Sequence, residues 1–338
     1  MPETILELNE LHTHFFTDNG EIPAVDGVSL SVNKGEVVGI VGESGCGKSV
    51  TSLSIMQLIP QPPGKIVSGE INFKGENLAN SSNKRMKQIR GNEISMIFQE
   101  PMTSLDPLFT IGNQLREAIQ LHNKMSKKEA SDRALDMLEM VGIPRPKEVL
   151  SEYPHQLSGG MRQRVMIAMA MSCDPEILIA DEPTTALDVT IQAQILDLMK
   201  KLNQEKDTAI MLITHDLGVV AEICDRVVVM YSGQVVEEGT TREILKDPKH
   251  PYSQGLIKSL PKIHEREQKL YSIPGTVPKP KMGVKGCRFA QRCPMAFERC
   301  FQEDPELYPL ENNRRSRCFL YDDAKREVTE NANADIRS

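Results

Sequence analysis

The sequence predicts an α/β fold in which a parallel sheet carries a phosphate-binding loop. Residues 36–41 have the pattern of a buried strand, the glycine-rich stretch 42–47 follows it directly, and residues 49–58 have a helical composition. Two further short apolar runs, 177–180 and 209–214, have the composition of central strands in a parallel sheet. Strand, glycine loop and helix in this order are what a phosphate-binding turn requires.

Other strands are expected near the N-terminus and in the second half of the chain. Residues 5–16 alternate roughly between polar and apolar and predict an edge strand, and residues 25–32 predict a second strand. Ser232-Gly233 separates two β-rich runs, 227–230 and 234–237, and so indicates a hairpin.

A largely helical segment is expected over residues 112–172. Ser126 and Glu129 have the spacing of a capping box, which satisfies free backbone N–H groups at a helix start. Gly142 is expected to end that helix. Its apolar face is predicted to comprise Ala130, Ala134, Leu135, Leu138 and Val141.

Composition restricts the class of protein. The chain has 338 residues, of which 39% are hydrophobic and 26% charged, as in ordinary globular proteins. A net charge of −7 argues against binding nucleic acid through a broad basic surface. No apolar run is long enough to span a bilayer, and the first residues lack the pattern of a signal peptide. We therefore expect a cytosolic chain, which would reach a membrane only by docking on another protein there.

The glycine-rich stretch matches the phosphate-loop pattern G-x-x-x-x-G-K-S without a mismatch. Its glycines let backbone N–H groups turn toward phosphates, Lys48 can neutralise phosphate charge, and the Ser49 hydroxyl can ligate Mg²⁺. Cys46 is expected to serve as a small residue whose pKa could be lowered by the nearby helix start. The predicted phosphate-binding residues are Gly42, Glu43, Ser44, Gly45, Cys46, Gly47, Lys48 and Ser49.

Two acids follow the apolar run 177–180. A strand that ends in Asp181-Glu182 presents both carboxylates at the carboxyl edge of the sheet, where open α/β sheets bind ligands. We expect Asp181 to hold Mg²⁺, directly or through water, and Glu182 to orient and polarise an attacking water.

A third motif gives the family resemblance. Residues 157–164, Leu-Ser-Gly-Gly-Met-Arg-Gln-Arg, resemble the signature of the ATP-binding cassette (ABC) ATPases and lie just before the acidic pair, as in that family. Ser158, Gly159 and Gly160 would open a helix whose N-terminus favours an anion. In ABC ATPases this anion is the γ-phosphate of ATP bound by the opposite subunit.

The resemblance extends to the remaining family motifs. Gln99 matches the Q-loop glutamine that reaches Mg²⁺, Asp188 lies in the D-loop, and His215 matches the switch histidine that contacts γ-phosphate. Phe15 is the expected aromatic that stacks on adenine, with Phe16 as the alternative.

The resemblance implies a particular architecture and mechanism. Residues 1–261 would form an ABC ATPase domain, with a RecA-like sheet core, an antiparallel β subdomain and a helical signature subdomain at about 100–172. Two such subunits would face head to tail, trap ATP between phosphate loop and signature, and move a transmembrane partner as they close.

Narrower features resemble the oligopeptide and dipeptide importer branch. These are residues 98–107, Tyr153-Pro154-His155-Gln156 and His250-Pro251-Tyr252, with 273–278 and the cysteine region beyond. The branch implies a second, related ATPase subunit, two permeases and an extracellular solute-binding protein, with this chain on the cytoplasmic face of the membrane. Alternatives are a nickel or other small-solute importer and, more remotely, a non-transport ABC ATPase or a metal-binding regulatory protein.

The C-terminal part is expected to form a small extension over residues 262–321, followed by a polar, disordered tail over 322–338. Some relatives in this branch carry a [4Fe–4S] cluster at cysteines that match Cys287, Cys293, Cys300 and Cys318. Zinc, or four reduced thiols without metal, are the alternatives. A basic cluster is expected to be a solvated face first and a partner-docking surface second; it comprises Lys279, Lys281, Lys285, Arg288 and Arg292.

Overall fold

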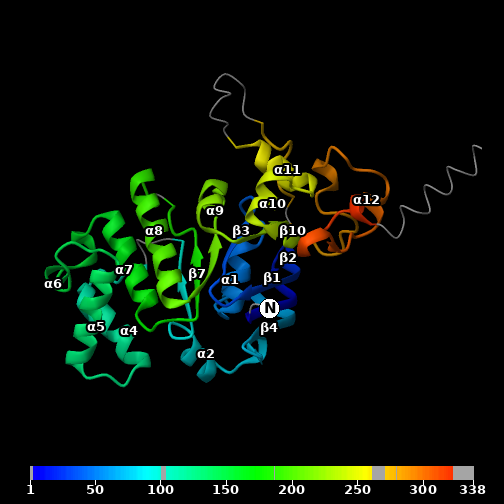
Figure 1. Ribbon diagram of the computed structural model, residues 1–338. Coiled ribbons are helices and arrows are strands. Elements are labelled where there is room, and N and C mark those ends of the chain that lie inside the picture. Colours follow the sequence, from blue (N-terminus) through cyan, green and yellow to red (C-terminus); the bar gives the residue numbers. More distant parts are fainter. Residues whose placement is uncertain (1–2, 100–103, 186, 261–270, 279, 323–338) are drawn as a thin grey trace, which may run out of the picture.

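The computed structural model describes residues 3–99, 104–185, 187–260, 271–278 and 280–322. An eight-stranded sheet runs through its centre in the order β11-β12-β10-β9-β3-β8-β7-β6 (Figure 1). The strands from β9 to β6 are parallel, and β10, β12 and β11 add antiparallel pairs at one edge. The strands are β3 (Val37–Val41), β6 (Ile94–Ile97), β7 (Ile177–Asp181), β8 (Ala209–Ile213), β9 (Arg226–Tyr231), β10 (Gln234–Thr240), β11 (Tyr308–Pro309) and β12 (Arg315–Ser316). The two apolar runs predicted as central parallel strands are therefore confirmed as β7 and β8.

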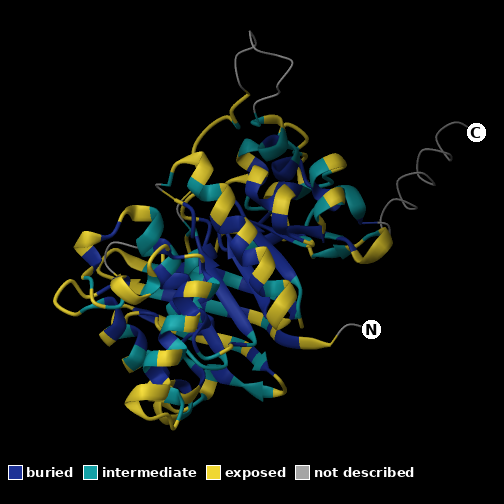
Figure 2. Cartoon of the chain, turned by 60° about the vertical axis from the view of Figure 1, so that its left-hand side comes forward, coloured by how far each residue is buried: buried dark blue, intermediate teal, exposed yellow. Residues whose placement is uncertain are grey.

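The sheet separates two hydrophobic cores. Alternate residues of β3 enter different cores: Val38 and Ile40 pack with the N-terminal strands, whereas Val37 and Val41 pack with the helices on the other face. Figure 2 shows the resulting band of buried residues along the central strands. A strand buried on both faces explains the unbroken apolar run that the sequence shows here.

Helices flank the sheet and form one lateral lobe. The described helices are α1 (Lys48–Ile55), α2 (Asn83–Ile89), α4 (Ile111–His122), α5 (Lys127–Met140), α6 (Pro146–Val149), α7 (Gly159–Met171), α8 (Val189–Lys206), α9 (Leu217–Ile223), α10 (Thr241–Lys246), α11 (Pro251–Lys258) and α12 (Arg299–Gln302). Helices α4 to α7 gather to one side of the sheet (Figure 1). No helix in these ranges is long and apolar enough to cross a membrane.

Helix α5 begins with the predicted capping box. The Ser126 hydroxyl accepts a hydrogen bond from the Glu129 backbone, and the Glu129 carboxylate accepts one from the Ser126 backbone. Four residues of α5 are buried, Ala130, Ala134, Met137 and Leu138. Leu135, predicted on the apolar face, is only half-buried, because that face is centred on Met137 instead.

A four-stranded antiparallel sheet packs beside the main one, in the order β2-β1-β4-β5. Its strands are β1 (Thr4–Thr17), β2 (Gly20–Asn33), β4 (Gly64–Phe73) and β5 (Glu76–Asn77). The prediction of an edge strand over residues 5–16 is wrong, because β1 pairs with β2 on one side and β4 on the other. Polar–apolar alternation reports which faces of a strand are buried and carries no information about its lateral neighbours.

The hairpin predicted at Ser232-Gly233 joins β9 to β10. Both turn residues have positive φ, 46° and 83°, as a tight two-residue hairpin turn requires. The next strands of this sheet, β12 and β11, come from the cysteine-bearing part of the chain. The boundary predicted near Lys262 lies outside the described ranges, as do residues 323–338 of the predicted tail. The first residue of that tail, Asp322, contradicts the prediction of disorder, because it is 8% exposed and forms an ion pair with Arg299.

Candidate nucleotide site

The phosphate loop joins β3 to α1, and its glycines have a steric cause. Gly42 has φ 153°, and a Cβ there would lie 2.3 Å from the Met230 carbonyl oxygen. Gly47 has φ 103°, and a Cβ there would lie 2.4 Å from the Ala24 carbonyl oxygen. Only glycine combines the left-handed backbone of Gly47 with this close approach to β2.

Lys48 folds back over the loop that it follows. Its buried ammonium donates hydrogen bonds to the carbonyl oxygens of Gly42 (2.8 Å) and Glu43 (3.2 Å). These hydrogen bonds tie the Lys48 side chain back to the phosphate loop. They place its positive charge at the start of α1, where the helix dipole also favours anions.

Cys46 differs from its expected state. It is 1% exposed, and burial raises the pKa of its thiol although nearby Lys48 opposes that shift. The expectation of a lowered pKa is wrong because loss of solvent outweighs the neighbouring charge. The thiol serves as a small buried group beneath the loop.

Asp181 ends β7 beside the phosphate loop. It is 4% exposed, and its Oδ1 has no hydrogen-bond partner among the described residues. Burial raises the pKa of this carboxyl, and a hydrogen bond with Ser49 opposes the rise. An unpartnered buried carboxylate oxygen is costly, and a cation would satisfy it. Asp181 and Ser49 thus have the oxygen donors that suit Mg²⁺.

Glu182 is the centre of a small polar network. Its carboxylate lies 3.1 Å from His215 Nδ1 and accepts hydrogen bonds from Thr185 Oγ1 (2.9 Å) and Gln99 Nε2 (3.3 Å). Its backbone φ of 48° is unusual for a residue other than glycine. Burial raises the pKa of Glu182, but the hydrogen bonds from His215 and Thr185 prevail and leave that pKa below its ordinary value. Glu182 is therefore an ionised acceptor at neutral pH.

Among these groups, Lys48, Ser49, Gln99 and Glu182 line one cavity of about 150 Å³, whereas Asp181 and His215 are not among its described lining residues. The lining residues are Ala24, Ser44, Gly45, Gly47, Lys48, Ser49, Val50, Gln99 and Glu182. Most of these residues were predicted as site residues. Ala24 and Val50 were not. Ala24 could be recognised only from the folded structure, because its carbonyl oxygen lies close to both Gly47 and Gly233.

The signature residues have a different position. Ser158 caps α7, and its hydroxyl accepts a hydrogen bond from the Met161 backbone. Ser158 and Gly159 are exposed, and none of the three signature residues is among the described residues that line the phosphate cavity. Asp188 likewise caps a helix, accepting a hydrogen bond from Ile191 N at the start of α8. This surface is therefore free to meet another molecule.

The two candidate aromatic residues lie next to each other on β1. Phe15 is half-buried, whereas Phe16 is 50% exposed. Phe15 pairs in register with Ile22 and Gly64, and its ring edge lies 3.1 Å from the Cβ that a side chain at position 64 would have. The role of Phe15 in adenine stacking stays a prediction, as does the alternative, Phe16.

Some motif residues cannot be placed. Ala186, beside the D-loop residue Asp188, lies outside the described ranges, as do residues 100–103 after the Q-loop glutamine and Lys279 of the basic cluster. Arg288 and Arg292 of that cluster contradict the expectation of a solvated face. Their side chains are only 13% and 6% exposed, because each forms an ion pair with the ATPase domain, Arg288 with Asp26 and Arg292 with Glu43.

The four clustered cysteines line one small pocket in the extension. All four are free thiols, and Cys300 is buried while Cys287, Cys293 and Cys318 are half-buried. Phe289 and Phe319 line the same pocket. Burial raises the pKa of Cys287 to about 11 and that of Cys318 to about 12.

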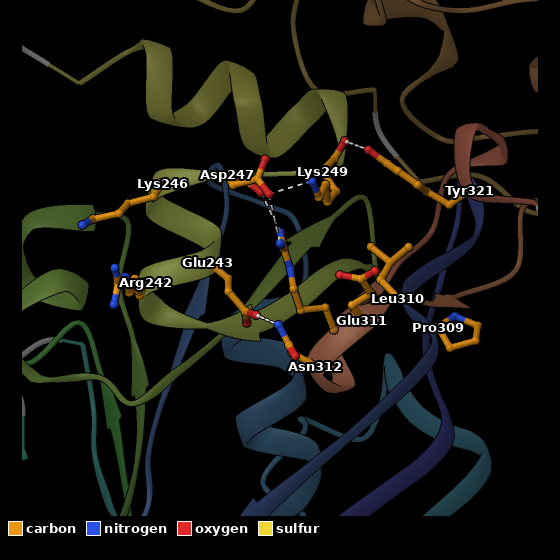
Figure 3. Close-up of a pocket in the computed structure, with 11 residues that line it drawn as sticks. Arg242, Glu243, Lys246, Asp247, Lys249, Pro309, Leu310, Glu311, Asn312 and Tyr321 are labelled. Atoms are coloured by element: carbon orange, nitrogen blue, oxygen red, sulfur yellow. Dashed lines mark hydrogen bonds and ion pairs between the residues drawn. The ribbon is translucent and has the colours of Figure 1, made fainter.

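A larger cavity, of about 670 Å³, lies where α10 meets the C-terminal strands (Figure 3). Two contacts join polar side chains of its lining: Lys249 pairs with Asp247 at 2.6 Å, and the Asn312 amide donates a hydrogen bond to Glu243 at 3.3 Å. Tyr321 donates a hydrogen bond to the Lys249 carbonyl oxygen. This cavity is a polar junction between the extension and the sheet.

The fold and the nucleotide site together define an ABC-type ATPase cassette. Solved cassettes have the same fold. One is the ATP-binding cassette MJ0796 in a dimeric post-hydrolysis state bound to ADP and Pi, which is 31% identical in sequence with a TM-score of 0.64. The match covers 70% of this chain and 99% of that one. CbiO1 from Clostridium perfringens, part of the ABC transporter complex cbiONQ, is 28% identical with a TM-score of 0.61, covering 72% and 92%.

Sequence comparison assigns the chain to a narrower family of proteins than its fold does. The ABC transporter family matches residues 25–185, and the oligopeptide/dipeptide transporter C-terminal region matches residues 236–300. The oligopeptide transport ATP-binding protein AppD of Bacillus subtilis (strain 168) is 55% identical over 95% of this chain and 98% of its own length. The dipeptide transport ATP-binding protein DppD of Escherichia coli (strain K12) is 50% identical over the same shares. The chain belongs to the ATP-binding proteins of ABC transporters that carry the oligopeptide/dipeptide transporter C-terminal region, and it is an ATPase subunit.

Proposed function

We propose that this chain powers the import of dipeptides or oligopeptides through partner permeases by binding and hydrolysing ATP. The observation that carries the proposal is the combination of the phosphate-loop cavity, which Lys48, Ser49, Gln99 and Glu182 line, with the C-terminal region of the peptide-transporter branch. Relatives of about half identity over nearly the full chain are named as oligopeptide and dipeptide transport ATP-binding proteins. The protein would act on the cytoplasmic face of the membrane, held there by its permeases.

ATP and Mg²⁺ have clear positions in this proposal. Lys48 and the backbone N–H groups of the loop would hold the phosphates, and Ser49, Asp181 and Gln99 would hold Mg²⁺, which neutralises charge on the transferred phosphoryl group. Glu182, ionised and oriented by His215 and Thr185, accepts a hydrogen bond from the attacking water and aligns it. His215 is 63% exposed, which leaves its ring accessible to a γ-phosphate.

A second ATPase subunit would complete each site. Ser158 and Gly159 are exposed at the start of α7, and the N-terminus of a helix favours an anion. In a head-to-tail pair they would cover the partner's ATP, and Asp188 would lie in the same interface. Closure of this pair would drive the permeases, and hydrolysis would reopen it.

An apolar groove beside the Q-loop is the proposed permease-docking surface. The groove has a volume of about 330 Å³ and lies between β6 and the helices α4 and α7; its apolar lining includes Leu58, Phe98, Leu121, Met166 and Met169. Phe98 is 41% exposed and directly precedes Gln99. An exposed apolar groove marks a protein contact, and a helix or loop docked there would act on the neighbouring Gln99.

The four cysteines are proposed to hold a [4Fe–4S] cluster, with zinc as the alternative. All four are free thiols that line one small pocket of the extension. Cysteine thiolates suit both an iron–sulfur cluster and a tetrahedral zinc, and either would stabilise this small extension.

Uptake of labelled peptides tests the proposed cargo. Cells that carry Glu182→Gln in place of the natural chain should lose uptake of a labelled dipeptide-to-oligopeptide panel while the protein level holds. The variant keeps the shape of the side chain and removes the ionised acceptor. Unchanged peptide uptake would contradict the peptide cargo, and labelled nickel and other small solutes would then be measured in the same cells.

A further inference from the structure

The C-terminal extension reaches into the phosphate loop through one arginine. Arg292, which lies 249 residues after Glu43, forms a two-pronged ion pair with it: Nη1 to Oε2 at 2.8 Å and Nη2 to Oε1 at 3.1 Å. The Arg292 side chain is 6% exposed and that of Glu43 is 31% exposed. Parallel charge-assisted hydrogen bonds of this kind fix both distance and orientation.

Arg292 is itself held rigidly. Its Nε donates to the Pro274 carbonyl oxygen (2.8 Å), and its Nη1 also donates to the Tyr231 hydroxyl (3.3 Å). The guanidinium lies 5.8 Å from the Tyr231 ring centre and 5.9 Å from the Phe289 ring centre. Because these contacts fix the guanidinium of Arg292, its ion pair fixes the position of the Glu43 carboxylate.

A second contact fixes the backbone of the same loop residue. The Glu43 N–H donates to the buried Tyr252 hydroxyl at 2.8 Å. Tyr252 belongs to α11, where His250 caps the helix and Pro251 occupies its first turn. The rings of Tyr231, Tyr252 and Phe289 pack against one another with centres 4.6 to 5.4 Å apart. Side chain and backbone of Glu43 are therefore both held from distant parts of the chain.

We propose that Arg292 is a positioning residue for ATP: it holds the phosphate loop in its binding conformation from the C-terminal extension. The Glu43 carbonyl oxygen accepts a hydrogen bond from Lys48, so a shift of Glu43 moves the lysine that faces the phosphates. Arg292 does not line the phosphate cavity among the described residues and acts only through the loop. The inference rests on ATP binding at this loop and is independent of the cargo.

The test uses the purified full-length chain and measures the Kd for Mg-ATP, the KM for ATP and kcat. Arg292→Met should raise Kd and KM about tenfold, as expected for loss of a bidentate charge-assisted pair, while kcat changes less than twofold. Arg292→Lys should recover part of the affinity, because one charged contact to Glu43 remains. Arg299→Met is the matched control. Arg299 forms ion pairs with Glu303 and Asp322, neither of which belongs to the phosphate loop, and its loss should leave both ATP constants unchanged.

A double-substitution cycle separates positioning from general stability. Glu43→Gln removes the same pair from the loop side, so Arg292→Met in that background should raise the ATP Kd by less than twofold further. The inference is overturned if Arg292→Met lowers the melting temperature as Arg299→Met does while the ATP Kd stays at its natural value. It is also overturned if Arg292→Met raises the Kd equally with and without Glu43→Gln.

Discussion

The phosphate loop and the C-terminal extension represent two ways in which a sequence encodes a site. The loop is local: Gly42, Lys48 and Ser49 lie within eight residues, and their spacing alone defines the turn and its chemistry. The extension works at long range, since Arg292 and Tyr252 contact Glu43 across 249 and 209 residues. Local motifs can be read from spacing, whereas contacts of this second kind appear only once the chain is folded.

The largest effect is expected from a change inside the loop. Gly47→Ala places a Cβ 2.4 Å from the Ala24 carbonyl oxygen and also strains a φ of 103°. Displacing the loop costs about 3 kcal/mol, which lowers ATP affinity about a hundredfold. Isothermal titration calorimetry with Mg-ATP measures this affinity. Gly75→Ala is the control, because φ is also positive there (83°) but, its chain neighbours aside, no atom of the described residues lies within 4 Å of the new Cβ. Equal ATP affinity in the two variants would contradict the steric account.

Much of the nucleotide site could be predicted from such local patterns, and the failures share one cause. The cavity residues from Ser44 to Ser49 and the acid Glu182 follow from motif spacing. The expectations that failed through distant contacts are the edge position of β1, the lowered pKa of Cys46 and the solvated face at Arg288 and Arg292. Each depends on neighbours far away in the sequence, which decide lateral strand pairing, desolvation and ion pairing.

The next largest effect is expected from the cysteines of the C-terminal extension. Cys293→Ser should lower the iron content of anaerobically purified protein to background, because it removes one of four proposed thiolate ligands. Metal analysis of the natural chain decides between iron and zinc in the same experiment. Cys173→Ser is the control. Cys173 is half-buried outside the extension and should have no effect. Equal iron in both variants would remove Cys293 from the proposed site.

The smallest expected effect is a change in the melting temperature of the protein without nucleotide. Asp181→Asn removes a buried charge whose Oδ1 has no partner in the described part of the chain, and should raise the melting temperature of the nucleotide-free and metal-free protein by about 2 °C at neutral pH. Burial raises the pKa of Asp181, so the folded carboxylate is unfavourable above that pKa and becomes neutral below it. The gain should therefore vanish as the pH falls through that pKa, as thermal melts across the acidic range would show.

The exposed carboxylate of Asp132 on α5 gives the matched control for this substitution. Asp132→Asn should leave the melting temperature unchanged. A lower melting temperature for Asp181→Asn at neutral pH would mean that the buried carboxylate stabilises the nucleotide-free fold, contrary to the geometry.

The most direct measurement is ATP hydrolysis and ATP binding by Glu182→Gln, compared with the natural chain in the same preparation. Glu182 is ionised at neutral pH and is held by His215, Thr185 and Gln99 at the edge of the phosphate cavity. Its loss as acceptor should lower kcat at least about a hundredfold, while the Kd for Mg-ATP changes less than threefold. A kcat close to that of the natural chain would contradict the central claim, because hydrolysis would then not depend on this carboxylate.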